Sequence, residues 1–126
     1  EDAHISETLP DKNSVFGVFD GHGGKGVPMQ GQKINFVERH FIEELKKNGS
    51  YIRKDYEKAL KETFIKMDEL LLSESGKREI VAIQKEMREK DNGPKYEEES
   101  HAGCTANVVL ITPEWTYCAN AGDSRA

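Results

Sequence analysis

Hydrophobic positions along the chain fall into three zones that differ in spacing. The first, Ser14–Phe19 (SVFGVF), is a short run of β-branched and aromatic residues, which predicts a strand covered on both faces. In the second zone, from about Ile34 to Lys90, apolar residues recur every three or four positions and predict amphipathic helices. The third zone, from residue 105 onward, is again rich in β-branched residues and predicts strands.

Two helices of the middle zone are well marked. The first has apolar residues at successive spacings of 3, 4 and 4 and ends at Asn48-Gly49, as at a helix C-cap; these residues are Ile34, Val37, Phe41 and Leu45. The second follows Asp55, a suitable N-cap, with spacings of 4, 4, 3 and 4 through Tyr56, Leu60, Phe64, Met67 and Leu71. Each segment therefore predicts a helix with one apolar face to bury.

A weaker helical pattern, through Ile80, Ile83 and Met87, ends at residues 91–94 (DNGP), and the charged segment 95–100 is expected to be an exposed loop. Beyond it, Thr105–Thr112 (TANVVLIT) and Trp115–Ala121 (WTYCANA) flank Pro113-Glu114 and predict an antiparallel hairpin. A strand, then helices, then a hairpin is an α+β order rather than regular βαβ alternation.

Composition narrows the possible partners. The 126 residues amount to about one domain, and the 18 basic and 23 acidic residues are interleaved, with a net charge of -5. Neither nucleic acid nor an anionic membrane surface is an expected partner. No apolar run approaches the roughly 20 residues of a membrane span, and the N-terminal segment lacks the order of a secretory signal, so an intracellular setting, cytoplasmic or nuclear, is expected. Cys104 and Cys118 are expected to be reduced, buried thiols, since a disulfide would require their strands to face each other.

The segment Asp20–Gly24 (DGHGG) follows the first apolar run and carries candidate chemistry. A carboxylate at the end of a buried strand costs free energy unless a cation or backbone donors compensate it. Gly21 is expected to let the backbone turn sharply and to bring its carbonyl near the same cation. A carboxylate, a carbonyl and waters suit Mg²⁺ or Mn²⁺, and the adjacent His22 is placed to transfer a proton.

Other interpretations of these residues stay open on the pattern alone. DGHGG also fits a plain strand-to-helix turn or a phosphate-binding loop, although GxxxxGK[ST] is not present. His22 also fits a surface histidine, and Asp123 a turn acid bonded to its own backbone. Glu1 and Asp2 also fit solvated acids.

Four motifs, taken together and in this order, resemble the PP2C (PPM) family of metal-dependent protein serine/threonine phosphatases. They are EDAH at Glu1–His4, VFDGHGG at Val18–Gly24, GCTANVVLI at Gly103–Ile111 and ANAGDSRA at Ala119–Ala126. The helical middle agrees in kind, as long amphipathic helices between the motifs, although Pro28–Lys33 (PMQGQK) looks irregular for the start of the family's first helix.

The resemblance implies a role for each matching residue. Asp20 would bridge two Mg²⁺ or Mn²⁺ ions, and Gly21 would donate its carbonyl to one of them. Glu1 would help to hold the second ion, and Asp2 would orient the waters bound there.

Two further roles complete the implied site. His22 would act as general acid toward the leaving alcohol, and Asp123 would contribute to an additional, weaker metal site. The catalytic set implied is therefore His22, Asp2 and Asp20, with phosphorylated proteins as substrates.

The implied fold is a four-layer α-β-β-α sandwich, in which antiparallel sheets are flanked by antiparallel helices. Residues 1–126 are expected to form the N-terminal portion of one such catalytic domain, incomplete at both ends, because the family's phosphate-gripping arginine and two later metal-binding aspartates have no counterpart in this chain. The implied reaction is hydrolysis of phosphoserine or phosphothreonine by a water held between two metal ions, in the parent protein rather than in this fragment. The alternative is a catalytically silent binding or scaffold module on the same fold.

Overall fold

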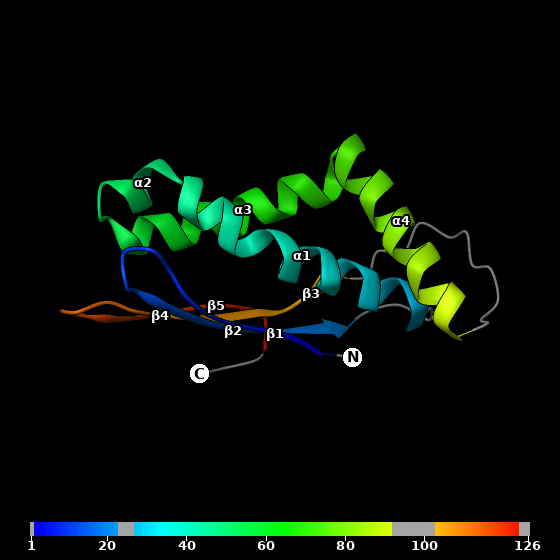
Figure 1. Ribbon diagram of the computed structural model, residues 1–126, viewed down its shortest axis with the longest axis horizontal. Helices are drawn as coiled ribbons and strands as arrows, with labels where there is room; N and C mark the ends of the chain where they lie inside the picture. Colours follow the sequence, from blue (N-terminus) through cyan, green and yellow to red (C-terminus); the bar gives the residue numbers. More distant parts are fainter. Residues whose placement is uncertain (1, 23–26, 92–102, 124–126) are drawn as a thin grey trace.

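The computed structural model describes residues 2–22, 27–91 and 103–123. One antiparallel sheet lies beneath a layer of helices, and all the helices are on the same side of the sheet (Figure 1). The elements in chain order are β1 (Asp2–Thr8), β2 (Ser14–His22), α1 (Val27–Lys47), α2 (Gly49–Ile52), α3 (Tyr56–Leu72), α4 (Glu74–Asp91), β3 (Gly103–Cys104), β4 (Ala106–Ile111) and β5 (Thr116–Ala121). The predicted α+β class is confirmed, as are the predicted helices and the β4–β5 hairpin.

The sheet has the strand order β1-β2-β4-β5, and the short strand β3 pairs with the end of β2. All of these pairings are antiparallel. Strand β1 was not predicted from the sequence, because only Ala3, Ile5 and the following Leu9 are buried, and the other described side chains of this segment are exposed. A half-buried strand of this kind lacks the continuous apolar run that marked β2.

The core lies between the inner face of the sheet and helices α1 and α3. Val15 and Phe19 of β2 and Val108 and Leu110 of β4 are all 0% exposed, so these strands present alternate residues to the helices. An aromatic chain then connects the layers, since the ring centroids of Phe19 and Phe41 and those of Phe41 and Phe64 are each 5.8 Å apart. This packing ties β2 to α1 and α1 to α3.

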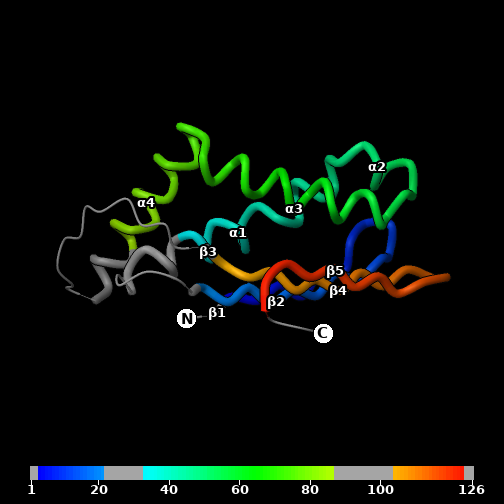
Figure 2. Tube along the Cα trace, turned by 180° about the vertical axis from the view of Figure 1, so that it is seen from behind, coloured from blue at the N-terminus to red at the C-terminus, as the bar shows by residue number. Residues whose placement is uncertain are grey.

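None of the helices in the described residues lies on the outer face of the sheet, as the view from behind also shows (Figure 2). Phe16, Val18 and Ile111 are 44%, 48% and 42% exposed there. The prediction that β2 is covered on both faces is therefore wrong for the described part of this chain, because its outward side chains Phe16 and Val18 are exposed. Cys118 was also expected to be buried and is exposed on the edge strand β5, while Cys104 is half-buried; both thiols are free.

Helix α1 begins at Val27, earlier than the apolar spacing suggested. Pro28 falls in its first turn, where the missing backbone N–H has no intrahelical partner to lose, so the segment that looked irregular is a regular helix start. The predicted stop after Lys47 is confirmed, but Asn48 also caps the unpredicted α2 by accepting the Tyr51 N–H at 3.0 Å. The predicted loop at 95–100 lies outside the described residues.

Helix α4 packs across α1 through a second apolar cluster, in which Phe36 meets Ile80 and Ile83. Two polar contacts flank this cluster: His40 Nε2 lies 2.6 Å from Glu79 Oε1, and Arg39 donates to Glu86 at 3.1 Å. No helix in the described ranges is long and apolar enough to cross a membrane.

A hydrogen-bonded trio joins the β1–β2 turn to α2. The Tyr51 hydroxyl donates to Asp11 Oδ2 at 2.7 Å, and Asn13 Nδ2 donates to the Tyr51 hydroxyl at 3.1 Å. Tyr51 and Asn13 are buried. Burial, and then the bond to Asp11, raise the pKa of Tyr51 above its ordinary value.

This trio predicts an alkaline loss of stability that depends on Tyr51. Because the folded state holds the phenol neutral, the stabilisation is fully present below the unfolded-state pKa of about 10 and is lost progressively as the pH rises above it. We expect Tyr51→Phe to lower the free energy of unfolding at neutral pH by about 1 kcal/mol and the difference from wild type to shrink above pH ~10. Urea denaturation of both proteins at several alkaline pH values measures this; a constant difference would contradict it.

Candidate metal centre

The topology brings motifs that are far apart in the sequence to one end of the sheet. Strand β1 begins there, β2 ends there, β4 begins there and β5 ends there, because each strand runs antiparallel to its neighbour (Figures 1 and 2). All four motifs identified in the sequence border this end. The sequence pattern alone did not show this meeting, since it depends on the register between strands.

The register defines a row of residues that crosses the sheet at this end. Asp2 and Asp20 are Cα partners between β1 and β2. On the other side of β2, the pairs Val18↔Asn107 and Gly21↔Cys104 place Thr105 across from Asp20. Acidic residues at directly opposed positions of an antiparallel pair repel each other unless a cation lies close by.

Asp20 is a residue of β2, not of a turn after it. The strand continues through Gly21 and His22 because β3 pairs with them, Gly21 with Cys104 and His22 with Gly103. Gly21 is buried and extended, so the expectation that it turns the backbone is wrong. Asp20 itself is half-buried, with its backbone bonded to Thr105 on the neighbouring strand.

Asp123 follows the end of β5 in a turn that is held by two asparagines. Asn107 Nδ2 donates to Asn120 Oδ1 at 2.8 Å, and Asn120 Nδ2 donates to the Gly122 carbonyl at 3.0 Å. Gly122 has φ 109°, a conformation that residues with a Cβ rarely adopt. The sequence analysis missed these supporting residues, although the glycine directly before an acid at a strand end was a usable signal.

The site residues predicted from the sequence are described to different degrees. Glu1 lies outside the described residues, and Asp2 and His22 are placed here by their strand pairing alone. Within the described ranges, no three histidine, cysteine, aspartate or glutamate side chains are grouped closely enough to hold a metal ion. The structure thus brings Asp2 and Asp20 to adjacent strands, with Asp123 two residues beyond Ala121, whose Cα partner is Ala106.

The donors at this end of the sheet fit a hard divalent cation. Asp2, Asp20 and Asp123 are carboxylate residues that would supply oxygen ligands, and Gly21 would supply a backbone carbonyl. Mg²⁺ and Mn²⁺ prefer such oxygen ligands and retain several waters. The thiol nearest in register, Cys104, is a soft ligand that does not suit these hard cations, and burial raises its pKa.

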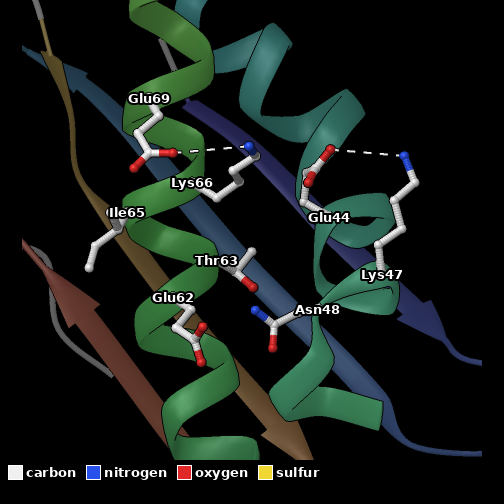
Figure 3. A pocket seen from close by; sticks show the side chains of 8 residues that line it. All are labelled: Glu44, Lys47, Asn48, Glu62, Thr63, Ile65, Lys66 and Glu69. Carbon is white, nitrogen blue, oxygen red and sulfur yellow. Dashed lines mark ion pairs between the residues drawn. The ribbon is translucent and has the colours of Figure 1, made fainter.

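A hollow elsewhere in the fold has different chemistry. A space of about 370 Å³ lies between the end of α1 and α3, where Glu44 pairs with Lys47 and Lys66 with Glu69, each at 4.0 Å (Figure 3). Glu62, which also lines this space, accepts a hydrogen bond from Ser50, and the buried Thr63 donates to the Ala59 carbonyl at 2.7 Å. These local pairings favour a structural groove rather than a catalytic site.

Comparison with known proteins identifies the family of this chain. The family model described as "Protein phosphatase 2C" matches residues 1–126. The chain is 51% identical to "Probable protein phosphatase 2C 4" and 50% identical to "Protein phosphatase 2C 1", both of Paramecium tetraurelia; in each case 100% of this chain aligns with 37% of the relative. It is 39% identical to "Protein phosphatase 2C homolog 2" of Hypocrea jecorina, again over 100% of this chain and 25% of the relative.

The antiparallel sheet under helices, with acidic residues at one end, is thus a portion of a phosphatase-type fold. The chain belongs to the protein phosphatase 2C family. It spans 37% of the length of the two Paramecium relatives named above.

Proposed function

We propose that the protein containing this chain is a Mg²⁺- or Mn²⁺-dependent protein serine/threonine phosphatase. The observation that carries the proposal is the row in which Asp2 and Asp20 are Cα partners on adjacent strands, at the end of the sheet that also holds Gly21, His22 and Asp123. Opposed carboxylates of this kind favour a bound cation.

The proposed roles follow from each residue's place in the sheet. Asp20 and the Gly21 carbonyl would hold the ion or ions, together with Asp2 and Glu1, and Asp123 would hold a weaker one. Two bound divalent ions would supply a hydroxide at neutral pH and offset charge on the phosphoryl oxygens.

The chain's own residues then act on the phosphorylated substrate. Because β3 pairs with Gly21 and His22, the histidine is anchored one strand position beyond the glycine and two beyond Asp20. From there His22 would donate a proton to the serine or threonine oxygen as the P–O bond breaks. This proton makes the departing oxygen an alcohol rather than an alkoxide.

A test on the full-length protein separates the phosphatase from a silent scaffold. Mn²⁺ binding is measured by calorimetry, and hydrolysis of a phosphothreonine peptide is measured with Mn²⁺ and with EDTA. The proposal requires both binding and EDTA-sensitive hydrolysis. Binding without hydrolysis indicates a scaffold that keeps a metal site, and absence of both overturns the proposed metal centre.

The role of His22 predicts a dependence on the leaving group. His22→Ala is expected to slow hydrolysis of a phosphoserine peptide by about 100-fold, because the alkoxide needs a proton, and to affect p-nitrophenyl phosphate much less. The ratio of the two kcat values measures this. Exposed His4 on β1, across from Val18, offers a control in His4→Ala, which should leave the ratio unchanged. Equal losses on the two substrates for His22→Ala would refute the general-acid role.

A further inference from the structure

Thr105 is the residue at which three of the sequence motifs meet. It lies between β3 and β4, and its backbone N–H donates to the Asp20 carbonyl at 2.7 Å. In return, the Asp20 N–H donates to Thr105 Oγ1 at 3.3 Å. In an ordinary antiparallel pair both of these bonds join backbone atoms, so at this position a side chain accepts the bond that a carbonyl would otherwise accept.

The opposite side of Thr105 contacts the turn that leads to Asp123. A Cβ placed on Gly122 would lie 2.6 Å from Thr105 Cγ2 and 2.9 Å from Thr105 Cβ, so the glycine backbone packs directly on this side chain. Thr105 is only 2% exposed. Its hydroxyl therefore serves Asp20 while its methyl group contacts Gly122.

We infer that Thr105 is a positioning residue for the metal centre, which fixes the backbone of Asp20 and seats the Gly122–Asp123 turn beside it. The inference rests on the proposed function. Asp20 lies in β2 between the residues that pair with β4 and those that pair with β3, and at this junction Thr105 bonds both backbone hydrogen-bonding groups of Asp20. Groups that orient metal ligands in this way typically change metal affinity by about 10- to 100-fold when removed.

Two substitutions separate the hydroxyl from the methyl group. Thr105→Val keeps the shape and the contact with Gly122 but removes the acceptor for the Asp20 N–H, whereas Thr105→Ser keeps the acceptor and removes the methyl. In the full-length protein we expect Thr105→Val to raise the Kd for Mn²⁺ by about tenfold. The Kd of Thr105→Ser for Mn²⁺ should stay within about threefold of the wild-type value, because serine retains the hydroxyl that accepts the Asp20 N–H.

A matched control is available in the helical layer. Thr63 is 1% exposed, and its hydroxyl bonds within α3 to the Ala59 carbonyl, so Thr63→Val removes an equally buried hydroxyl remote from Asp20. Calorimetric titration with Mn²⁺ and thermal unfolding are measured for all variants. Thr63→Val is expected to lower the melting temperature without changing the Kd.

The outcomes distinguish this inference from the proposed function. Failure of the wild-type protein to bind Mn²⁺ overturns both. If the wild type binds Mn²⁺ and Thr105→Val has the same Kd, the inference alone is overturned. The same holds if Thr105→Ser and Thr63→Val weaken Mn²⁺ binding as much as Thr105→Val does. Should Thr105→Val not fold, hydrogen exchange of the Asp20 amide in the wild type decides: protection supports the bond to Thr105, and rapid exchange overturns it.

Discussion

Replacement of Asp20 by alanine is expected to abolish metal-dependent hydrolysis while leaving the fold intact. The residue is half-buried at the end of β2 and contributes little to the core, so the free energy of unfolding without metal should change by less than about 1 kcal/mol. Loss of a direct metal ligand should reduce kcat/KM by more than about 100-fold, beyond the effect of an outer-shell residue. Assays of the full-length protein with a phosphothreonine peptide and saturating Mn²⁺ measure this.

Thermal unfolding gives a second readout of the same variant. A cation that binds only the folded state raises the melting temperature of the wild type, and Asp20→Ala should lose that shift. Without metal, removing one of two opposed acids should leave the melting temperature equal or slightly higher. Exposed Asp55, which precedes α3 and makes no side-chain capping bond, provides the control variant Asp55→Ala. A Mn²⁺-dependent shift that survives in Asp20→Ala would contradict the assignment.

Elements with strong periodicity were predictable from the sequence, and those defined by pairing were not. The spacing of Phe41 and Leu45 located α1 because each apolar residue meets the same core, and both are buried. Strand β1 and the extension of β2 to His22 escaped because their hydrogen bonds go to β2 and β3, which are distant in sequence. A short continuous stretch of sequence does not show which distant strand it will pair with.

The residues of the candidate site also differ in whether a local sequence signal could identify them. Asp20 and Gly21 stood out because an acid and glycines interrupt an apolar run, which is a local signal. Thr105 and Asn120 gave no such signal, since a threonine or an asparagine in a β-rich segment is ordinary until its partner is known. Phe16 and Val18 are exposed on the outer face of the sheet. In the sandwich fold implied by the family resemblance, the second sheet would pack on this face. The residues that would support the proposed metal centre are therefore brought together by strand register and could not be identified from composition.

Gly122→Ala is expected to be strongly destabilising and to weaken the candidate metal centre. The residue has φ 109°, and an added Cβ would lie 2.6 Å from a methyl group of Thr105, which is 2% exposed and bonded to Asp20. The clash cannot be relieved by a simple rotation of an exposed side chain. We expect a loss of about 2–3 kcal/mol in the free energy of unfolding and weaker Mn²⁺ binding, measured by urea denaturation and calorimetry.

A control glycine and a double variant separate the two causes of this loss, which are the clash with the Thr105 methyl group and the backbone strain at Gly122. At Gly49 an added Cβ would meet only the flexible guanidinium group of Arg53, at 3.2 Å, so Gly49→Ala should change stability by less than about 0.5 kcal/mol. Thr105→Ser removes the clashing methyl, so the double variant Thr105→Ser/Gly122→Ala should regain part of the lost stability, and the remainder measures the backbone strain. If the double variant instead loses as much stability as the two single variants together, the methyl contact does not constrain the turn, because substitutions of residues in contact are expected to have non-additive effects.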